Sequence, residues 1–379
     1  MSEFPEFNPV GFRKGELLKV MKKNGINGIL LSSPENVFYT TGYTTLPSSG
    51  NPIIYSLRKL FPFFSFISED GEVTLGCWGF STLGVKFGVD AIAGFSSTSE
   101  AGDVLKKLLK DKLRPGGVLG IESTTTYNFL ELIHQVIPTI KLVIADEHLL
   151  HLRLIKSAEE IRLLKKSNEI IETTLVELYD CIKPGMSRLD LIKEAKTRLF
   201  KNGAMGVSHI TFTFGKANPE IAIGETLGPN QLVVFDLGGI YEGYTSDNRR
   251  YGYTGKVPGA LAEHYNKMVS IVDKVGEFLI PGTTYTQIYH HALDLYQTYG
   301  IDFTQNTFNH VGHNMGLETE EDWLIDEPIR KVEPGMVINI ELYSTAQTGD
   351  SIGNEETYLV ESTGPVRIST LPREIHKIH

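Results

Sequence analysis

Five residues of the types that bind metal ions are spread over the second half of the chain. They are Asp236, Asp247, His313, Glu341 and Glu355. Four carboxylates and one imidazole form an oxygen-rich set, which suits Mn, Co, Fe or Zn better than a thiolate site would. Their summed charge of about −4 would neutralise two divalent cations, and a pair of metal ions can activate a water molecule that bridges them. The set therefore predicts a hydrolase with a dinuclear metal centre.

The spacing of the first two carboxylates predicts a hairpin. Asp236 and Asp247 lie 11 residues apart, which is too far for one face of a strand but suits two antiparallel strands joined at residues 240–243. Glycines in and beside this segment allow a tight reversal. Both carboxylates would then meet at one end of the hairpin.

The other three residues are expected to meet in a similar way. Glu341 and Glu355 lie 14 residues apart and would pair across two strands joined through residues 349–353. His313 would come from a loop whose flanking glycines let the backbone approach closely. The five side chains would then converge on one site.

The elements that must position these residues fall into two parts that divide near residue 150. Before it, strands alternate with helices, which is typical of a layered α/β domain; the strands are expected at 26–31, 63–67, 73–77 and 116–122 and the helices at 12–23 and 99–108. After it, helices are expected at 158–179, 188–201, 260–278 and 285–299, and strands at 232–235 and 336–340. We therefore expect two domains, 1–150 and 151–379.

Charge and composition exclude several classes of protein. A net charge of −10 without a basic tract argues against nucleic-acid binding. Apolar runs such as 60–66 are far too short to span a bilayer, and the acidic, polar start of the chain does not resemble a secretory signal. Cys77 and Cys181 match no zinc or redox spacing and are expected to be reduced, which favours a cytoplasmic protein.

The motifs and their order resemble the pita-bread metallopeptidase family, which includes aminopeptidase P, prolidase, methionine aminopeptidase and the metal-free creatinase. The resemblance runs from the segments 24–31 and 34–43 through 153–161 and 184–187 to the five metal-type residues. It implies an α+β fold, in which a pita-bread catalytic domain of two similar α/β halves follows a creatinase/prolidase-like α/β N-terminal domain. It also implies a homodimer.

The resemblance further implies a role for each of the five residues. Asp247 and Glu355 would bridge a pair of metal ions. Asp236 would hold the first ion, and His313 and Glu341 would hold the second. A hydroxide between the ions would attack a carbonyl carbon, and Glu341 would shuttle the proton. Counting along the family motif selects Glu355 over its neighbour Glu356.

The chain departs from the family pattern around the substrate. The family's peptidases usually carry a histidine seven residues after the ligand histidine, where this chain has Glu320, and another some 17 or 18 residues before the first aspartate ligand, where it has Asn218 and Pro219. Losing these imidazoles would cost transition-state stabilisation, although Glu320 could hold a substrate amine instead. Smaller departures are Arg249, where a threonine is usual, Leu342-Tyr343, where Pro-Gly is usual, and Gly353-Asn354, where Arg-Ile is common.

Other side chains are candidates to replace the missing groups. His209, in an alternating strand-like segment, and His310, three residues before the ligand histidine, either act as catalytic residues beside Glu341 or support the scaffold. Arg249 and Arg250 either pair with neighbouring carboxylates or bind an anionic group of the substrate.

Three functions are compatible with these residues. The primary hypothesis is a metal-dependent dipeptidase or aminopeptidase for Xaa-Pro bonds, the commonest activity among relatives with an N-terminal domain of this size. The second is a hydrolase or lyase for a small non-peptide metabolite, which the missing histidines favour. The third is a binding role without catalysis, which retention of all five ligands disfavours. That retention equally disfavours metal-free chemistry of the creatinase type.

Overall fold

The computed structural model describes residues 4–216, 219, 221–222, 224–303, 309–328 and 330–379 of the 379-residue chain. It divides into two units, Met1–Arg153 and Leu154–His379, each with its own sheets. None of the helices in the described part of the chain has the length and apolar character of a membrane span.

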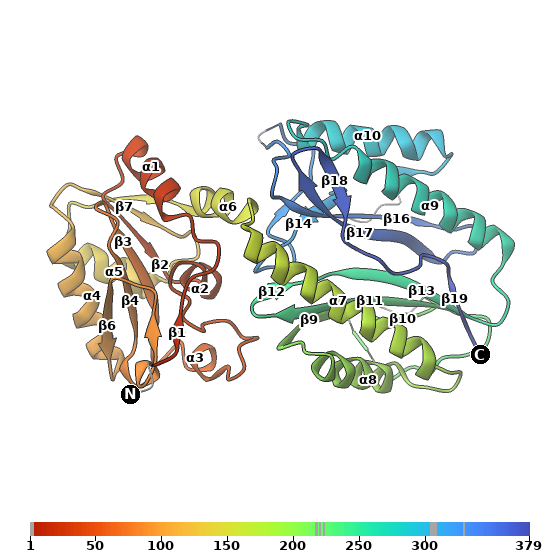
Figure 1. Ribbon diagram of the computed structural model, residues 1–379, viewed down its shortest axis with the longest axis horizontal. Helices are drawn as coiled ribbons and strands as arrows, with labels where there is room; N and C mark the ends of the chain where they lie inside the picture. Colours follow the sequence, from red (N-terminus) through yellow and green to blue (C-terminus); the bar gives the residue numbers. More distant parts are fainter. Residues whose placement is uncertain (1–3, 217–218, 220, 223, 304–308, 329) are drawn as a thin grey trace. The chain divides into compact units, whose positions relative to one another are not determined.

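A six-stranded mixed sheet forms the centre of the first unit (Figure 1). Its order is β6-β4-β3-β2-β7-β8, from β2 (Gly28–Leu31), β3 (Phe64–Ser68), β4 (Val73–Trp78), β6 (Ala91–Phe95), β7 (Val118–Ile121) and β8 (Lys141–Ile144). The central strands β2, β3 and β4 are antiparallel, whereas β7 and β6 run parallel to β2 and β4. A separate two-stranded sheet pairs β1 (Glu6–Phe7) with β5 (Lys86–Phe87).

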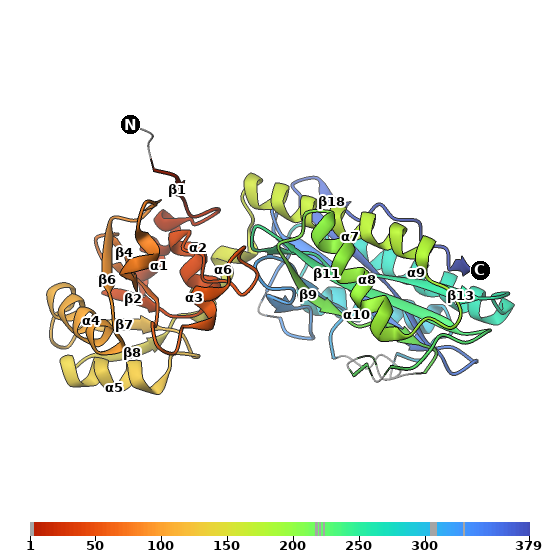
Figure 2. The same cartoon turned by 90° about the horizontal axis from the view of Figure 1, so that it is seen from below.

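Helices complete the first unit: α1 (Lys14–Asn24), α2 (Pro34–Thr41), α3 (Ile53–Ser56), α4 (Thr98–Lys112), α5 (Tyr127–Val136) and α6 (Asp146–Leu154), with a 3₁₀ turn, η1 (Gly79–Thr82). The helices α4 and α5 lie side by side (Figures 1 and 2). Leu105 and Leu109 are one turn apart on α4 and share a buried cluster with Phe64 and Phe66 of the sheet. This is the layered α/β domain that the alternating pattern predicted.

Two sheets form the centre of the second unit. The first contains β9 (Gly206–Ile210), β10 (Thr213–Phe214), β11 (Leu232–Tyr241), β12 (Tyr244–Thr245), β13 (Asn248–Thr254) and β19 (His376–Ile378). The second has the order β15-β14-β16-β17-β18, from β14 (Gly312–Asn314), β15 (Asp322–Trp323), β16 (Val337–Thr345), β17 (Ser351–Glu361) and β18 (Gly364–Arg367). The sheets meet where β13 contacts β17.

Two pairs of helices enclose these sheets (Figure 1): α7 (Ala158–Cys181) and α8 (Arg188–Lys201) pack on the first sheet, and α9 (Gly259–Glu277), beside α10 (Tyr285–Thr298), packs on the second. Side chains at the helix starts explain where these helices begin. Ser157 and Glu160 form a capping box on α7, and the Ser187 side chain caps α8.

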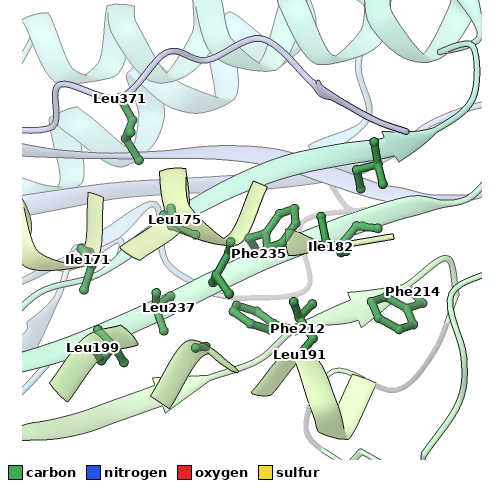
Figure 3. Packing of buried hydrophobic residues seen from close by; sticks show 14 of the residues in the cluster. Ile171, Leu175, Ile182, Leu191, Leu199, Phe212, Phe214, Phe235, Leu237 and Leu371 are labelled. Carbon is green, nitrogen blue, oxygen red and sulfur yellow. The ribbon is translucent and has the colours of Figure 1, made fainter. Parts of the chain in front are cut away.

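Strand β11 separates the hydrophobic core from the candidate site. Phe235 and Leu237 belong to the core cluster with Leu175 of α7 and Leu191 of α8 (Figure 3). Because side chains alternate along a strand, Asp236 points to the opposite face of the sheet. The apolar residues thus fix which way the carboxylate faces.

Candidate metal centre

A hairpin brings Asp236 and Asp247 together, as the sequence predicted. Strands β11 and β12 are joined by Glu242 and Gly243, whose φ angles of 47° and 91° suit a two-residue reversal. After this turn, β13 runs back along β11 with Arg249 opposite Asp236. Asp247 directly precedes β13 and therefore lies at the same end of the sheet.

His209 joins this pair from β9. It lies opposite Gly238 of β11, where a Cβ would overlap the imidazole, so glycine permits the close approach. The Nε2 of His209 lies 3.0 Å from Oδ1 of Asp236 and 3.0 Å from Oδ1 of Asp247. Burial alone would lower the pKa of His209, but the two carboxylates outweigh it and raise this pKa well above its ordinary value.

The second sheet supplies the other three predicted ligands. His313 is on β14, and Glu341 of β16 lies directly opposite Glu355 of β17. The Nε2 of His313 is 3.7 Å from Oδ2 of Asp247 and 3.7 Å from Oε2 of Glu341. All five residues are buried, and strands from both sheets bring them into one site.

The part of this site around His313 and Glu355 has buried atoms suited to binding a cation. The Nδ1 of His313 donates to the carbonyl oxygen of Thr319 at 2.8 Å, which leaves Nε2 as the lone-pair nitrogen. Within the described ranges, this Nε2 and Oε2 of Glu355 are buried without a hydrogen-bond partner. Ligand atoms of Asp247, His313 and Glu355 lie within 4.8 Å of one another. The donors present here fit a divalent ion.

The part of the site around Asp236 is occupied by the side chain of Arg249. Oδ2 of Asp236 accepts a hydrogen bond from the Arg249 guanidinium, which also lies 3.8 Å from Oε1 of Glu341. The guanidinium stacks on the Tyr343 ring at 4.1 Å. Burial would raise the pKa of Asp236, but Arg249 and His209 together hold it below its usual range. Both oxygens of Asp236 therefore already have cationic partners.

Two family models match the chain, one for each of its two units. The model of metallopeptidase family M24 matches residues 162–362, more than half of the chain, and the model of the creatinase/prolidase N-terminal domain matches residues 13–155. The chain belongs to metallopeptidase family M24. The resemblance inferred from the motifs is thereby confirmed, and membership implies the use of divalent metal ions.

Similarity to curated relatives and to solved structures covers almost the whole chain. The Xaa-Pro dipeptidase of Pyrococcus horikoshii is 26% identical, over 95% of this chain and 97% of its own, and that of Pyrococcus furiosus is 26% identical, over 96% and 99%. The solved prolidase from P. horikoshii OT3 has a TM-score of 0.80 at 24% identity, covering 96% of this chain and 99% of its own. The recombinant prolidase from Thermococcus sibiricus has a TM-score of 0.82 at 20% identity, covering 97% and 98%. The expected fold, a pita-bread domain after a creatinase/prolidase-like domain, is confirmed.

The two glutamates of this candidate site have pKa values raised above the ordinary value. Burial, reinforced by repulsion from Asp247 and Asp236, raises the pKa of Glu341 to about 8 against the attraction of Arg249. Burial and the neighbouring carboxylates likewise raise the pKa of Glu355 well above its ordinary value. A cation beside these groups would take the place of the protons that they otherwise hold.

The site opens into a cavity of about 770 Å³ in the second unit. Its charged lining comprises the carboxylates Asp236, Asp247, Glu318, Glu320 and Glu341 and the basic residues His209, Lys216 and Arg249. Glu320, which stands where M24 peptidases usually have a histidine, is oriented by a 2.7 Å hydrogen bond from Trp323 Nε1 to its Oε2. Pro219 also lines the cavity, whereas Asn218 lies outside the described residues.

His310 has a different environment from His209. Its ring packs on the Trp323 indole, with the centroids 5.2 Å apart, and lies 6.4 Å from the His313 ring. Burial and the nearby His313 lower the pKa of His310 to about 4, so the ring is neutral at pH 7. A catalytic role for His310 stays a prediction.

The structure gives the adjacent residues Arg249 and Arg250 different partners, and the same holds for Glu355 and Glu356. Arg250 and Glu356 form a fully buried ion pair at 3.1 Å, and Arg250 also donates to the Glu355 carbonyl oxygen at 3.0 Å. Of the two glutamates, Glu355 is the one whose carboxylate lies with Asp247 and His313. Of the two arginines, Arg249 is the one that enters the site.

Sequence reasoning missed several groups that hold the ligands. Asn339, on the same strand face as Glu341, donates to Oε1 of Glu355, and Tyr343 donates to Glu341 from two residues further along β16. The signal that could have found both is the two-residue period of a strand. Buried Lys156 also pairs with Glu321, in the loop that contains Thr319, at 2.7 Å; no spacing in the sequence indicates that contact.

Proposed function

We propose that this chain is a divalent-metal-dependent dipeptidase or aminopeptidase that cleaves Xaa-Pro peptides. The observation that carries the proposal is the pair of buried atoms, His313 Nε2 and Glu355 Oε2, that have no hydrogen-bond partner among the described residues. They lie beside Asp247, which lines a cavity large enough for a small peptide. The two curated Pyrococcus relatives described above are Xaa-Pro dipeptidases, which favours a peptide over a small metabolite as the substrate.

The proposed ligands are those of the sequence analysis: Asp236, Asp247, His313, Glu341 and Glu355. Their oxygen-rich chemistry suits Mn, Co, Fe or Zn, and we propose that the centre takes up to two such ions. Bound ions would polarise the scissile carbonyl and activate water. We further propose that residues 151–379 carry the reaction and residues 1–150 form a non-catalytic domain, in a cytoplasmic homodimer.

Residues of the chain itself would bind the peptide and move the proton. Glu341, whose carboxylate lines the cavity, would accept the proton of the attacking water and return it to the leaving nitrogen. His209 would hold Asp236 and Asp247 in place through its two 3.0 Å contacts. Glu320, fixed by Trp323, would bind the substrate's free α-ammonium group.

The test is release of proline from a panel of Xaa-Pro dipeptides and tripeptides by protein loaded with Mn or Co. Asp247→Ala should abolish cleavage, and so should chelation. Asp190→Asn, which alters an exposed carboxylate on α8, controls for the change of charge. Absence of cleavage by protein that still binds the metal would overturn the proposal and direct the search to small non-peptide substrates.

The role of Glu320 has a separate readout. Glu320→Gln keeps the acceptor for the Trp323 indole but removes the negative charge, so KM for free dipeptides should rise while metal content stays the same. Blocking the α-amino group of the substrate should remove the difference between the two proteins. An unchanged KM would exclude Glu320 as the ammonium site.

A further inference from the structure

We propose that Arg249 is a fixed positive charge that occupies the binding face of Asp236 and so makes the two metal positions unequal. One ion would be held firmly by Asp247, His313, Glu341 and Glu355. A second ion would bind at Asp236 only by displacing the guanidinium. The inference rests on the proposed metal centre but not on the identity of the substrate.

The contacts of Asp236 differ from those of His313 and Glu355. Its Oδ1 meets His209 Nε2 at 3.0 Å, and its Oδ2 accepts from Arg249. In the described part of the chain, by contrast, His313 Nε2 and Glu355 Oε2 have no hydrogen-bond partner. An incoming cation meets unpaired donors on one side and an already neutralised carboxylate on the other.

Packing holds the guanidinium in this position. The Arg249 side chain is 15% exposed and stacks on the Tyr343 ring at 4.1 Å. Tyr343 lies opposite Gly353 in the β16–β17 register. A Cβ at position 353 would meet the Tyr343 ring and the Leu342 carbonyl, so glycine leaves room for the ring on which the guanidinium stacks.

The charge of Arg249 cannot be removed by an ordinary change of pH, since a guanidinium stays protonated in proteins. A metal ion at Asp236 would therefore lie beside a permanent positive charge unless the side chain moved. Moving it would break the bond to Asp236 and the stacking on Tyr343. Binding at this position must overcome both losses, whereas binding beside Asp247 and His313 meets neither.

The competing interpretation is that Arg249 only orients Asp236 while a metal ion binds the same carboxylate. The two interpretations predict opposite effects of removing the arginine. If Arg249 competes, Arg249→Met frees Asp236 and strengthens the second ion. If Arg249 orients, the same change weakens it.

The test is the number and affinity of Co(II) ions bound by metal-stripped protein without substrate, followed by calorimetry and by the visible absorption of bound Co(II). The wild type should bind about one ion tightly and the second roughly tenfold to a hundredfold more weakly, the range by which such neighbouring groups alter metal affinity. Arg249→Met should bring the second affinity close to the first. Lys216→Met, which removes another positive charge from the cavity lining, should leave both affinities as in the wild type.

Asp236→Asn supplies an independent arm should Arg249→Met fail to fold. It should keep the tight ion and lose only the weak one. Two equally tight ions in the wild type, loss of the tight ion in Asp236→Asn, or weaker binding in folded Arg249→Met would each overturn the proposal. Failure to cleave Xaa-Pro peptides with the expected unequal binding would instead overturn only the proposed function.

Discussion

Replacing Lys156 with methionine should destabilise the second unit and weaken metal binding together. Lys156 Nζ and Glu321 Oε2 are 2.7 Å apart, and both side chains are 1% exposed. Removing one partner of a buried ion pair leaves the other charge uncompensated and typically costs about 3–5 kcal/mol. Glu321 also accepts from the Leu317 backbone at 3.0 Å, so the pair holds the loop whose Thr319 carbonyl orients His313.

Loosening that loop should reduce metal affinity by roughly tenfold to a hundredfold, the usual effect of losing a partner of a ligand histidine. Urea unfolding would measure the stability, and calorimetric titration with Mn would measure the affinity. Glu321→Gln in the Lys156→Met background removes both charges and should recover most of the lost stability. Lys193→Met breaks an exposed pair with Asp190 and serves as the control, with a much smaller change expected. A loss below about 1 kcal/mol in Lys156→Met, or a double variant as unstable as the sum of the singles, would refute the reasoning.

Two further predictions concern titratable groups away from the centre. Burial raises the pKa of the Cys77 thiol to about 12. In the native protein, Cys181, which is only partly buried, should therefore react first with a thiol reagent at pH 8. Rapid reaction of both thiols without denaturant would contradict this. Burial also raises the pKa of Glu160, despite its hydrogen bonds to Ser157 and Tyr244. The folded protein therefore binds a proton at Glu160 more readily than the unfolded chain does. The wild type should thus gain stability relative to Glu160→Gln as the pH falls from this raised pKa to the pKa of Glu160 in the unfolded chain. Thermal unfolding of both proteins between pH 7 and pH 4 checks the sign, and a difference that does not depend on pH would contradict it.

The pairing of the ligand strands could be predicted from the sequence because it depends on local chemistry. A tight turn and a two-residue period were enough to place Asp236 with Asp247 and Glu341 opposite Glu355. The prediction for the second reversal was wrong in detail. The chain turns at residues 346–350 rather than 349–353, because β16 continues through Thr345. The predicted strand ended at residue 340, whereas in the structure it continues through Glu341 and Tyr343, and Tyr343 donates to Glu341 in the buried site.

The partners of the arginines could not be predicted in the same way. Choosing between Arg249 and Arg250 requires knowing that the strand after the turn continues past Asp247 through both arginines, and the predicted hairpin gave no end for that strand. Once β13 is present, alternation sends Arg249 to Asp236 and Arg250 to Glu356, on opposite faces. The Lys156 contact is beyond any such rule, because it joins residues 165 positions apart through tertiary packing alone.

The same alternation explains why the predicted ligands match the family pattern while the substrate side departs from it. Asp236 lies between Phe235 and Leu237, and Glu341 lies between two apolar residues that are equally buried. A shift of one residue in either strand would turn the carboxylate into the core and expose its neighbours, so the hydrophobic pattern fixes the ligand. Glu320 lies on a turn, with no apolar alternation to keep it in place. A change there costs little folding energy, and the pocket can therefore acquire a new specificity around an unchanged set of ligands.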